Sequence, residues 1–349
     1  MLLNLISSIS NSDFMKKFAI RSLLYTSPLI LVVLAIIVID PYYLLHKDKE
    51  YNQEIFDIGS SFDQGRRYKI FTYFNNPTDK IILGASEICR IDERNIPESG
   101  WHSLAFGGAP LQESLRLFFE ITSINSVKKA IIAPEFIKYY NAVSSVNGDP
   151  YYANFQWETS QSFKTFSIYN NKLDYFVDKY TLKATYEVIN HKLGANSLQS
   201  VPQLSKEAFW EHQLNYAKGV YGENALFDFK QEEIKQIFAD VKNHADSLGV
   251  DVVIVIPPQH NELLQLELGD KIFDTYQSYI CTLVDIFGQI QYLAYADGIS
   301  DDDESFSDPF HCLTAEPLLD VLFRGEKRYL LSNEKQVINR LNEIKNKIQ

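Results

Sequence analysis

The sequence predicts a three-layer α/β/α domain on a mostly parallel, five-stranded sheet, with one N-terminal transmembrane helix and an aromatic-rich insertion. Two observations carry this prediction: short apolar runs alternate with amphipathic segments, and a charge-free apolar segment lies near the N-terminus. Alternating strands and helices favour a parallel sheet covered by helices on both faces. The 349 residues, 46% of them hydrophobic, are enough for one large domain of this class.

Composition excludes several classes of function. The formal net charge is -12, whereas a nucleic-acid-binding protein needs a clustered basic face, so we expect no nucleic-acid partner. The three cysteines, Cys89, Cys281 and Cys312, are too few and too scattered for a disulfide framework or a zinc site. The histidines outside the candidate site show no metal-ligand spacing. We therefore expect no metal and no cofactor.

The N-terminal segment has the length and composition of a membrane anchor. Residues 22–39 carry no charge, which is about the length that spans a bilayer core, and Lys16, Lys17 and Arg21 precede them. The positive-inside rule places residues 1–21 in the cytoplasm, residues 22–40 in the plasma (inner) membrane and the main domain on the extracytoplasmic, periplasmic side.

Two other interpretations of this segment are weaker. A cleaved signal peptide would have a shorter apolar core and a small-residue cleavage site, but "IVIDPYYLL" follows instead. A buried core helix is disfavoured because the segment is apolar all round. An uncleaved, single-pass anchor is the prediction.

The rest of the chain divides by its hydrophobic pattern. We expect a juxtamembrane segment at 41–76, an α/β domain at 77–325 with an insertion at about 139–225, and a C-terminal helix within 326–349. The predicted strands are 79–86, 102–108, 128–136, 250–259 and 289–296. The predicted helices are 110–124, 228–249, 260–269, 273–288, 314–323 and 333–348.

The insertion is rich in aromatic residues, as in "DPYYANFQWET" and "SFKTFSIYNN". Exposed aromatic side chains beside an active site often stack on sugars. The alternative, that they fill a small second core, is favoured.

Three polar segments follow predicted strands: "GAS" (84–86), "FGGA" (106–109) and "SDPFH" (307–311). In a parallel sheet, ligands bind beyond the carboxyl ends of the strands. Ser86 is the candidate nucleophile, His311 its base, and Asp308 the group that orients the base. Backbone N–H groups of Ser86, Gly107 and Gly108 are candidates for an oxyanion hole. The alternative for the last segment is a surface turn with an idle histidine.

Three further residues are candidates for the pocket: Glu87 after the nucleophile, Glu135 at the end of the third strand, and His260 at the start of a helix. For Glu87 the alternative is a solvated position, and for His260 it is a neighbour of a helix cap. The acidic run 301–304 lacks the spacing of a calcium loop and is interpreted as a solvated loop.

Several of these segments resemble the SGNH/GDSL hydrolase superfamily. "IILGASEICRID" looks like its first block, which carries the nucleophilic serine, and "SLAFGGAPLQESLRLF" like its second, which carries an oxyanion-hole glycine. "SDPFHCLTAEPLLDVLF" looks like its fifth block, the Asp-x-x-His. With "KKAIIAPEFIKYYN" and "VVIVIPPQHNELLQL", the resemblance covers about 79–140 and 228–325 and extends to a membrane-anchored bacterial branch linked to cell-envelope polysaccharides.

The sequence departs from the pattern of this superfamily in two places. The first block has Gly84-Ala85-Ser86 in place of Gly-Asp-Ser. The third block of the superfamily carries a Gly-x-Asn-Asp whose Asn completes the oxyanion hole, whereas here the third strand ends in "APEF". The second departure leaves acyl transfer or a degenerate site open beside hydrolysis.

The resemblance implies a flavodoxin-like SGNH fold and an extracytoplasmic serine esterase or O-acyltransferase, acting through Ser86, His311 and Asp308. Its substrates would be acyl esters, acetyl esters above all, of a cell-surface polysaccharide. Partners would be the acylated glycan or acyl donor, the membrane, and a polytopic membrane acyltransferase. The alternative is a catalytically degenerate protein of the same fold that binds glycan or scaffolds polysaccharide assembly.

Overall fold

The computed structural model forms two compact units, one of residues 1–75 and 165–199 and one of residues 76–164 and 200–349, which are considered separately. The structure describes residues 13–39, 69–70, 72–74, 76–88, 91, 93–109, 111–137, 205–221 and 230–349. Most of the predicted juxtamembrane segment and most of the predicted insertion, like Cys89, lie outside the described residues.

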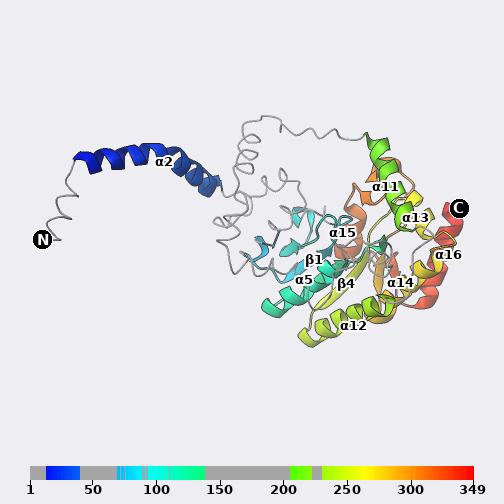
Figure 1. Ribbon diagram of the computed structural model, residues 1–349. Coiled ribbons are helices and arrows are strands. Elements are labelled where there is room, and N and C mark those ends of the chain that lie inside the picture. Colours follow the sequence, from blue (N-terminus) through cyan, green and yellow to red (C-terminus); the bar gives the residue numbers. More distant parts are fainter. Residues whose placement is uncertain are drawn as a thin grey trace. The chain divides into compact units, whose positions relative to one another are not determined.

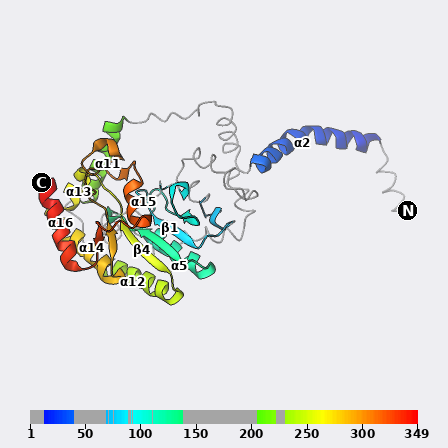
Figure 2. The same cartoon turned by 180° about the vertical axis from the view of Figure 1, so that it is seen from behind.

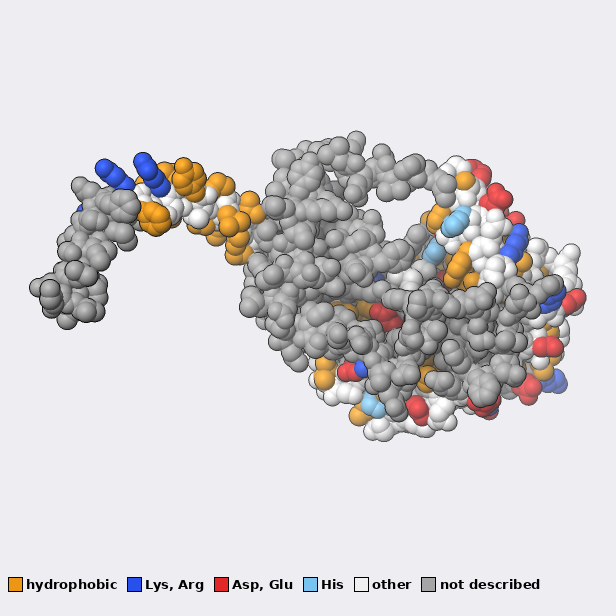
Figure 3. All heavy atoms as spheres, in the orientation of Figure 1, with side chains coloured by type: hydrophobic (Ala, Val, Ile, Leu, Met, Phe, Trp, Pro, Cys, Tyr) orange, Lys and Arg blue, Asp and Glu red, His pale blue; other side chains and the backbone are white. Residues whose placement is uncertain are grey.

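The first unit contains the N-terminal helix α2, Asp13–Ile39. Its segment Lys16–Ala35 is long and apolar enough to cross a membrane, and none of it is buried. Figure 3 shows hydrophobic side chains all along this helix, with basic side chains toward its N-terminal end. Pro28 lies within the helix and cannot donate to the carbonyl of Leu24; the Ser27 hydroxyl donates to that carbonyl instead, at 2.9 Å.

The second unit is an α/β domain built on a mostly parallel sheet. The strands of the sheet are β1 (Lys80–Gly84), β2 (Trp101–Ser103), β3 (Lys129–Ala133), β4 (Asp251–Ile256), β5 (Ile290–Tyr292) and β8 (Leu330–Leu331). Their order is β2-β1-β3-β4-β5-β8. The first five pair in parallel, which confirms the predicted strands and their direction.

The prediction of five strands was wrong by one. β8 pairs antiparallel to β5 and forms a sixth, edge strand. It has two residues, too few for either the alternating or the continuous apolar pattern by which strands are recognised. The predicted strands were also longer than those observed, because each apolar run continues into the turn that follows its strand.

Helices of the second unit contact the sheet and one another (Figure 1). They are α5 (Leu111–Ile124), α11 (Lys206–Val220), α12 (Lys230–Leu248), α13 (Asn261–Glu267), α14 (Phe273–Phe287), α15 (Glu316–Phe323) and α16 (Glu334–Ile348), with short 3-10 turns η1 (Glu93–Asn95) and η3 (Asp303–Ser305). α5 contacts β1, whereas α12 and α14 contact β4. A two-stranded hairpin, β6 (Phe306–Asp308) and β7 (His311–Cys312), precedes α15.

α15 packs against one set of alternate strand residues. Its Leu318 and Leu319 share a hydrophobic cluster with Ile82 of β1 and Ile131 of β3. Both views of the molecule show α15 beside β1 (Figure 2). Because strand residues alternate between the two faces of a sheet, this cluster fixes the face on which α15 lies. The chain therefore passes from β5, near one edge, back across the sheet toward β1.

Candidate functional site

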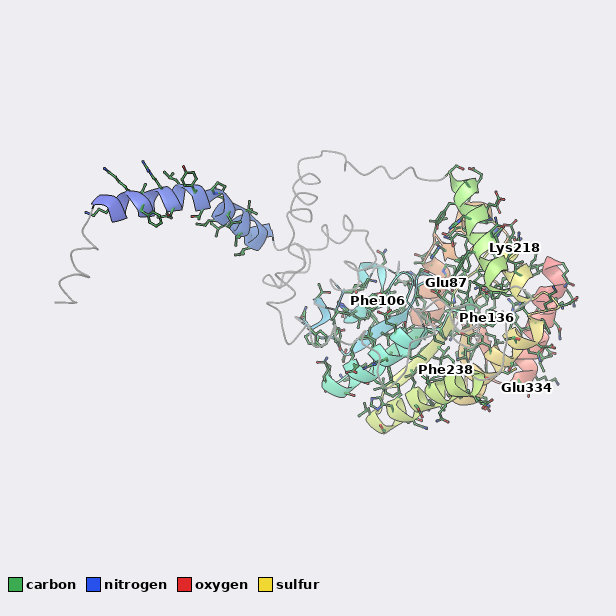
Figure 4. All side chains as sticks on the ribbon, viewed as in Figure 1. Glu87, Phe106, Phe136, Lys218, Phe238 and Glu334 are labelled. Carbon is green, nitrogen blue, oxygen red and sulfur yellow. The ribbon has the colours of Figure 1, made fainter. Side chains whose placement is uncertain are left out.

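The predicted site begins where β1 and β2 end. Beyond β2 the parallel pairing continues, because the N–H of Leu104 donates to Ile82 at 2.7 Å and that of Phe106 to Gly84 at 3.1 Å. The turn at Gly107 and Gly108 therefore starts beside the turn that carries Ser86. Gly108 has φ +67°, in the left-handed region that favours glycine. Figure 4 labels Phe106, Glu87 and Phe136, which mark the ends of the first three strands.

Gly84 allows the turn after β1 to lie close to β3. A Cβ atom at this position would lie 2.6 Å from Cγ2 of Ile88 and 3.1 Å from both the Cβ and the carbonyl oxygen of Ala133. Only glycine fits there without movement of its neighbours. Ser86 follows on this turn and is partly exposed, as a nucleophile must be, whereas Glu87 is buried.

Asp308 and His311 form the pair that their spacing predicts. Nδ1 of His311 lies 2.7 Å from Oδ1 and 2.6 Å from Oδ2 of Asp308. The Asp308 side chain is 1% exposed and also accepts the N–H of Phe310 and the hydroxyl of Ser307. A carboxylate at Nδ1 fixes the tautomer that leaves Nε2 as an acceptor. Nε2 makes no hydrogen bond with any described residue.

His260 anchors this hairpin to the end of β4. Its backbone N–H donates to the carbonyl of Pro309, the residue after Asp308, at 3.1 Å. Its ring is 3% exposed, caps α13 through Nδ1, and lies 3.1 Å from Asp303 through Nε2. Trp210 of α11 packs edge-on against the same ring, 4.7 Å between centroids. His260 thus holds elements together and is itself the N-cap of α13, whereas the alternative predicted from the sequence was a neighbour of the cap.

The acidic run before the hairpin has structural partners. Asp301 accepts hydrogen bonds from Asn261 and Tyr295, and Asp302 caps η3. Glu304 pairs with Lys206 of α11 at 3.7 Å. Within the described part of the chain, no group of three or more His, Cys, Asp or Glu side chains is arranged to hold a metal ion.

The two halves of the predicted triad follow the carboxyl ends of different parallel strands: Ser86 follows β1, and the hairpin that carries Asp308 and His311 is bonded, through the Pro309 carbonyl, to His260 in the segment after β4. Ile88, two residues after Ser86, packs in the cluster that contains α15, the helix directly after the hairpin. A Ser86–His311 hydrogen bond is not among those made by the described residues. The pairing of these two residues stays a prediction.

Glu135 occupies the end of β3, where the resemblance leads us to expect an Asn. Its Oε1 accepts the N–H of Glu87, the residue after Ser86, at 2.9 Å, and its side chain is buried. The preceding carbonyl, of Pro134, accepts the hydroxyl of Tyr279. Phe136 packs among Tyr221, Tyr276 and Tyr279. The "APEF" segment is therefore held by contacts of both Pro134 and Phe136, the neighbours of Glu135, and Glu135 itself is a hydrogen-bond acceptor.

A further buried acid, Glu267 of α13, was missed at the sequence level. It is 0% exposed and accepts the hydroxyl of Tyr221 at 2.7 Å and the amide of Gln259 at 3.4 Å. Burial, assisted by the charge of Glu135, raises the pKa of Glu267 to about 8. Its position four residues after Leu263, on the buried face of α13, was the available signal.

Comparisons with known proteins identify no relative: no protein-family model, curated protein or solved structure matched this chain.

Proposed function

We propose that this protein is an extracytoplasmic, membrane-anchored serine esterase or O-acyltransferase of SGNH type, acting on acyl esters, acetyl esters above all, of a cell-surface polysaccharide. The observation that carries the proposal is the buried Asp308 carboxylate at Nδ1 of His311, in a hairpin bonded to the segment after β4, while Ser86 follows the parallel strand β1. Such a pair prepares an imidazole to act as a general base. The substrate class rests on the resemblance of the sequence blocks.

The proposed reaction proceeds in two steps. The Ser86 hydroxyl attacks the acyl carbonyl, Nε2 of His311 takes its proton, and the alcohol of the ester leaves with that proton. Asp308 stabilises the imidazolium that forms between these events. Water or a sugar hydroxyl then attacks the acyl-enzyme, again through His311, and Ser86 is released. The oxyanion is met by backbone N–H groups of Ser86 and of the Gly107–Gly108 turn.

The proposal includes the three-layer arrangement and the location of the domain. Support for two helical layers comes from the helices that contact the strands. α5, α12 and α14 contact β1 or β4, and α15 packs on the paired residues Ile82 of β1 and Ile131 of β3. Support for the location comes from α2 and from the basic residues before it. A domain outside the cytoplasm would reach exported polysaccharide, its acyl donor and a polytopic membrane acyltransferase.

The test is a serine-directed chemical probe together with ester cleavage, on the full chain in detergent. The wild type should be labelled by a fluorophosphonate and should release acetate from aryl acetates and acetylated glycans. Ser86→Ala should abolish labelling and lower the rate by about 10³-fold or more, and His311→Ala should do the same. Ser123→Ala, an exposed serine of α5, is the matched control and should behave as the wild type.

A wild type without labelling or acetate release would refute the enzymatic proposal. A second function would then be favoured by Glu135, which accepts a hydrogen bond where the superfamily places an amide that donates one. That function is glycan binding or scaffolding by a catalytically degenerate domain. It predicts glycan binding that a Ser86→Ala/His311→Ala double variant retains.

A further inference from the structure

His260, in the junction between β4 and α13, contacts the hairpin before, on and after β6. Before the strand, Nε2 of His260 lies 3.1 Å from Oδ1 of Asp303. On the strand, the imidazole packs edge-on against the buried Phe306, with 5.4 Å between ring centroids. After the strand, the His260 backbone N–H donates to the carbonyl of Pro309 at 3.1 Å. Asp308 lies between the last two of these contacts.

The two ring nitrogens of His260 have different partners. Nδ1 accepts the N–H of Glu262 at 3.4 Å, which caps α13. The hydrogen of this tautomer is therefore on Nε2, which donates to Asp303. The side chain of His260 is 3% exposed, so the ring is held by packing as well as by hydrogen bonds. Capping needs only Nδ1, whereas the hairpin is reached through Nε2 and the ring.

α11 holds the same elements from a distant part of the sequence. Trp210 packs against the His260 ring, and its Nε1 donates to Glu262 at 2.5 Å. Lys206 donates to the carbonyl of Asp303 at 2.9 Å. α11 contacts both β6 and α13, and it lies beside α13 in both views (Figures 1 and 2). The His260 ring therefore contacts α11 as well as β6, which limits its movement.

The position of the proposed base depends on β6. Nδ1 of His311 is bonded to Asp308, which is the last residue of this strand and also accepts the N–H of Phe310 at 3.1 Å. A general base must lie within hydrogen-bond reach of the proton that it takes. A misplacement of about 1 Å can lower a rate by about 10²-fold. Contacts that fix β6 therefore bear on the reaction, although they do not touch the reacting atoms.

We propose that His260 is a positioning residue for the Asp308–His311 pair, acting through Nε2 on Asp303 and through its ring on Phe306. This inference rests on the proposed function, because it concerns the base of that reaction. The Asp303 side chain is 78% exposed, so its contact with Nε2 is weak when taken alone. The packing of His260 on Phe306 acts together with it on the same strand.

Two amide variants separate positioning from capping. Asn places its amide group near Nδ1 of a histidine, so His260→Asn can still cap α13 but does not reach Asp303 and has no ring for Phe306. Gln places its amide group near Nε2, so His260→Gln can still donate to Asp303. If His260 only caps a helix, His260→Asn should behave as the wild type and His260→Gln should not. Positioning predicts the opposite order.

The first measurement is hydrogen exchange at the Phe310 amide, in the full chain in detergent and without substrate, because Asp308 accepts this N–H. His260→Asn should accelerate the exchange by about ten-fold, and His260→Gln by about three-fold or less. The Leu104 amide, which is bonded to β1 within the sheet, is the internal control and should not change. His212→Asn makes the same change at an exposed residue of α11 and should match the wild type.

The second measurement is fluorophosphonate labelling together with ester cleavage. His260→Asn should lower the labelling rate and kcat by about 10- to 100-fold and leave KM within about two-fold, because a displaced base affects the reaction and not substrate binding. His260→Gln should recover most of this loss. Val241→Ala removes part of a buried side chain of α12 and destabilises the fold, but it should change neither kcat nor the labelling rate. It separates positioning from general destabilisation.

Two results would overturn the inference: Phe310 exchange and labelling of His260→Asn within about two-fold of the wild type, or losses in His260→Gln as large as those in His260→Asn. If His260→Asn does not fold, Asp303→Ala decides, because it removes the partner of Nε2 at an exposed position. Its Phe310 exchange should be faster than in the wild type, and unchanged exchange would overturn the inference. Faster exchange in these variants together with an unlabelled wild type would support the contact of His260 with the hairpin and refute the serine chemistry.

Discussion

Replacing Glu267 by Gln tests whether the buried Glu267 is neutral, through the pH dependence of the free energy of unfolding. The reference pKa of a glutamate is 4.5 and the folded protein raises the pKa of Glu267 to about 8. Between these values the folded chain holds a proton that the unfolded chain has released. The free energy of unfolding therefore falls as pH rises through this window, by about 1.4 kcal/mol per pH unit from this group.

The magnitude follows directly. From about pH 5 to pH 7 the wild type should lose about 3 kcal/mol through Glu267 alone. Gln at position 267 cannot ionise, so Glu267→Gln lacks this pH-dependent loss. The free energy of unfolding of the variant, minus that of the wild type, should therefore rise by the same amount from about pH 5 to pH 7. Titrating groups that do not interact with Glu267 contribute equally to both proteins and cancel in the difference.

The assay is denaturant unfolding of the full chain in detergent, followed by tryptophan fluorescence at several pH values. Glu211→Gln is the control, because Glu211 is an exposed residue of α11 and undergoes the same chemical change. Its difference from the wild type should stay level. A Glu267→Gln difference that varies by less than about 0.5 kcal/mol from pH 5 to pH 7 would refute the assignment of a neutral, buried Glu267.

Two further predictions concern the turn and the anchor. Gly84→Ala should lower the free energy of unfolding by about 1–3 kcal/mol because the new Cβ atom would lie too close to Ile88 and Ala133. Gly219→Ala is the control: a Cβ atom at this position of α11 meets no other atom, so the variant should be as stable as the wild type or more stable. The denaturant midpoint measures both effects, and equal midpoint changes would contradict the argument. A reporter that is active only outside the cytoplasm, fused after Gln349, should be active, and replacing Lys16, Lys17 and Arg21 by Gln should reduce that activity. An inactive reporter in the wild-type fusion would contradict the proposed orientation.

The sequence predicted β1 to β5 and every helix of the second unit except α11, because each of these elements has its own local pattern. β1, β3 and β4 are continuous apolar runs that end at Gly, Pro or polar residues, and their burial follows from covered sheet faces. The final helix was predicted to within one residue, since Asn333 caps it and its buried residues recur at helical spacing. β8 has no such pattern, because its existence depends on pairing with β5.

The same distinction applies to the candidate site. The Asp308–His311 pair could be predicted because both residues lie on one short turn. Two residues only three positions apart on such a turn are close enough for their side chains to form a hydrogen bond. The partners of His260 could not, because Asp303 and Trp210 come from distant segments that only the fold brings together. Glu135 was recognised by its position after β3, but its bond to the Glu87 N–H depends on the register between β1 and β3.

That register also determines what the site can do without the expected Asn. Ala133 pairs with Gly84, so the residue two positions beyond Ala133 meets the turn beyond Gly84. An amide side chain in that region would donate to a substrate oxyanion, whereas Glu135 accepts from the backbone that presents Ser86. In the proposed reaction the oxyanion would be met by backbone N–H groups of the Ser86 and Gly107–Gly108 turns, which the Phe106–Gly84 hydrogen bond keeps adjacent.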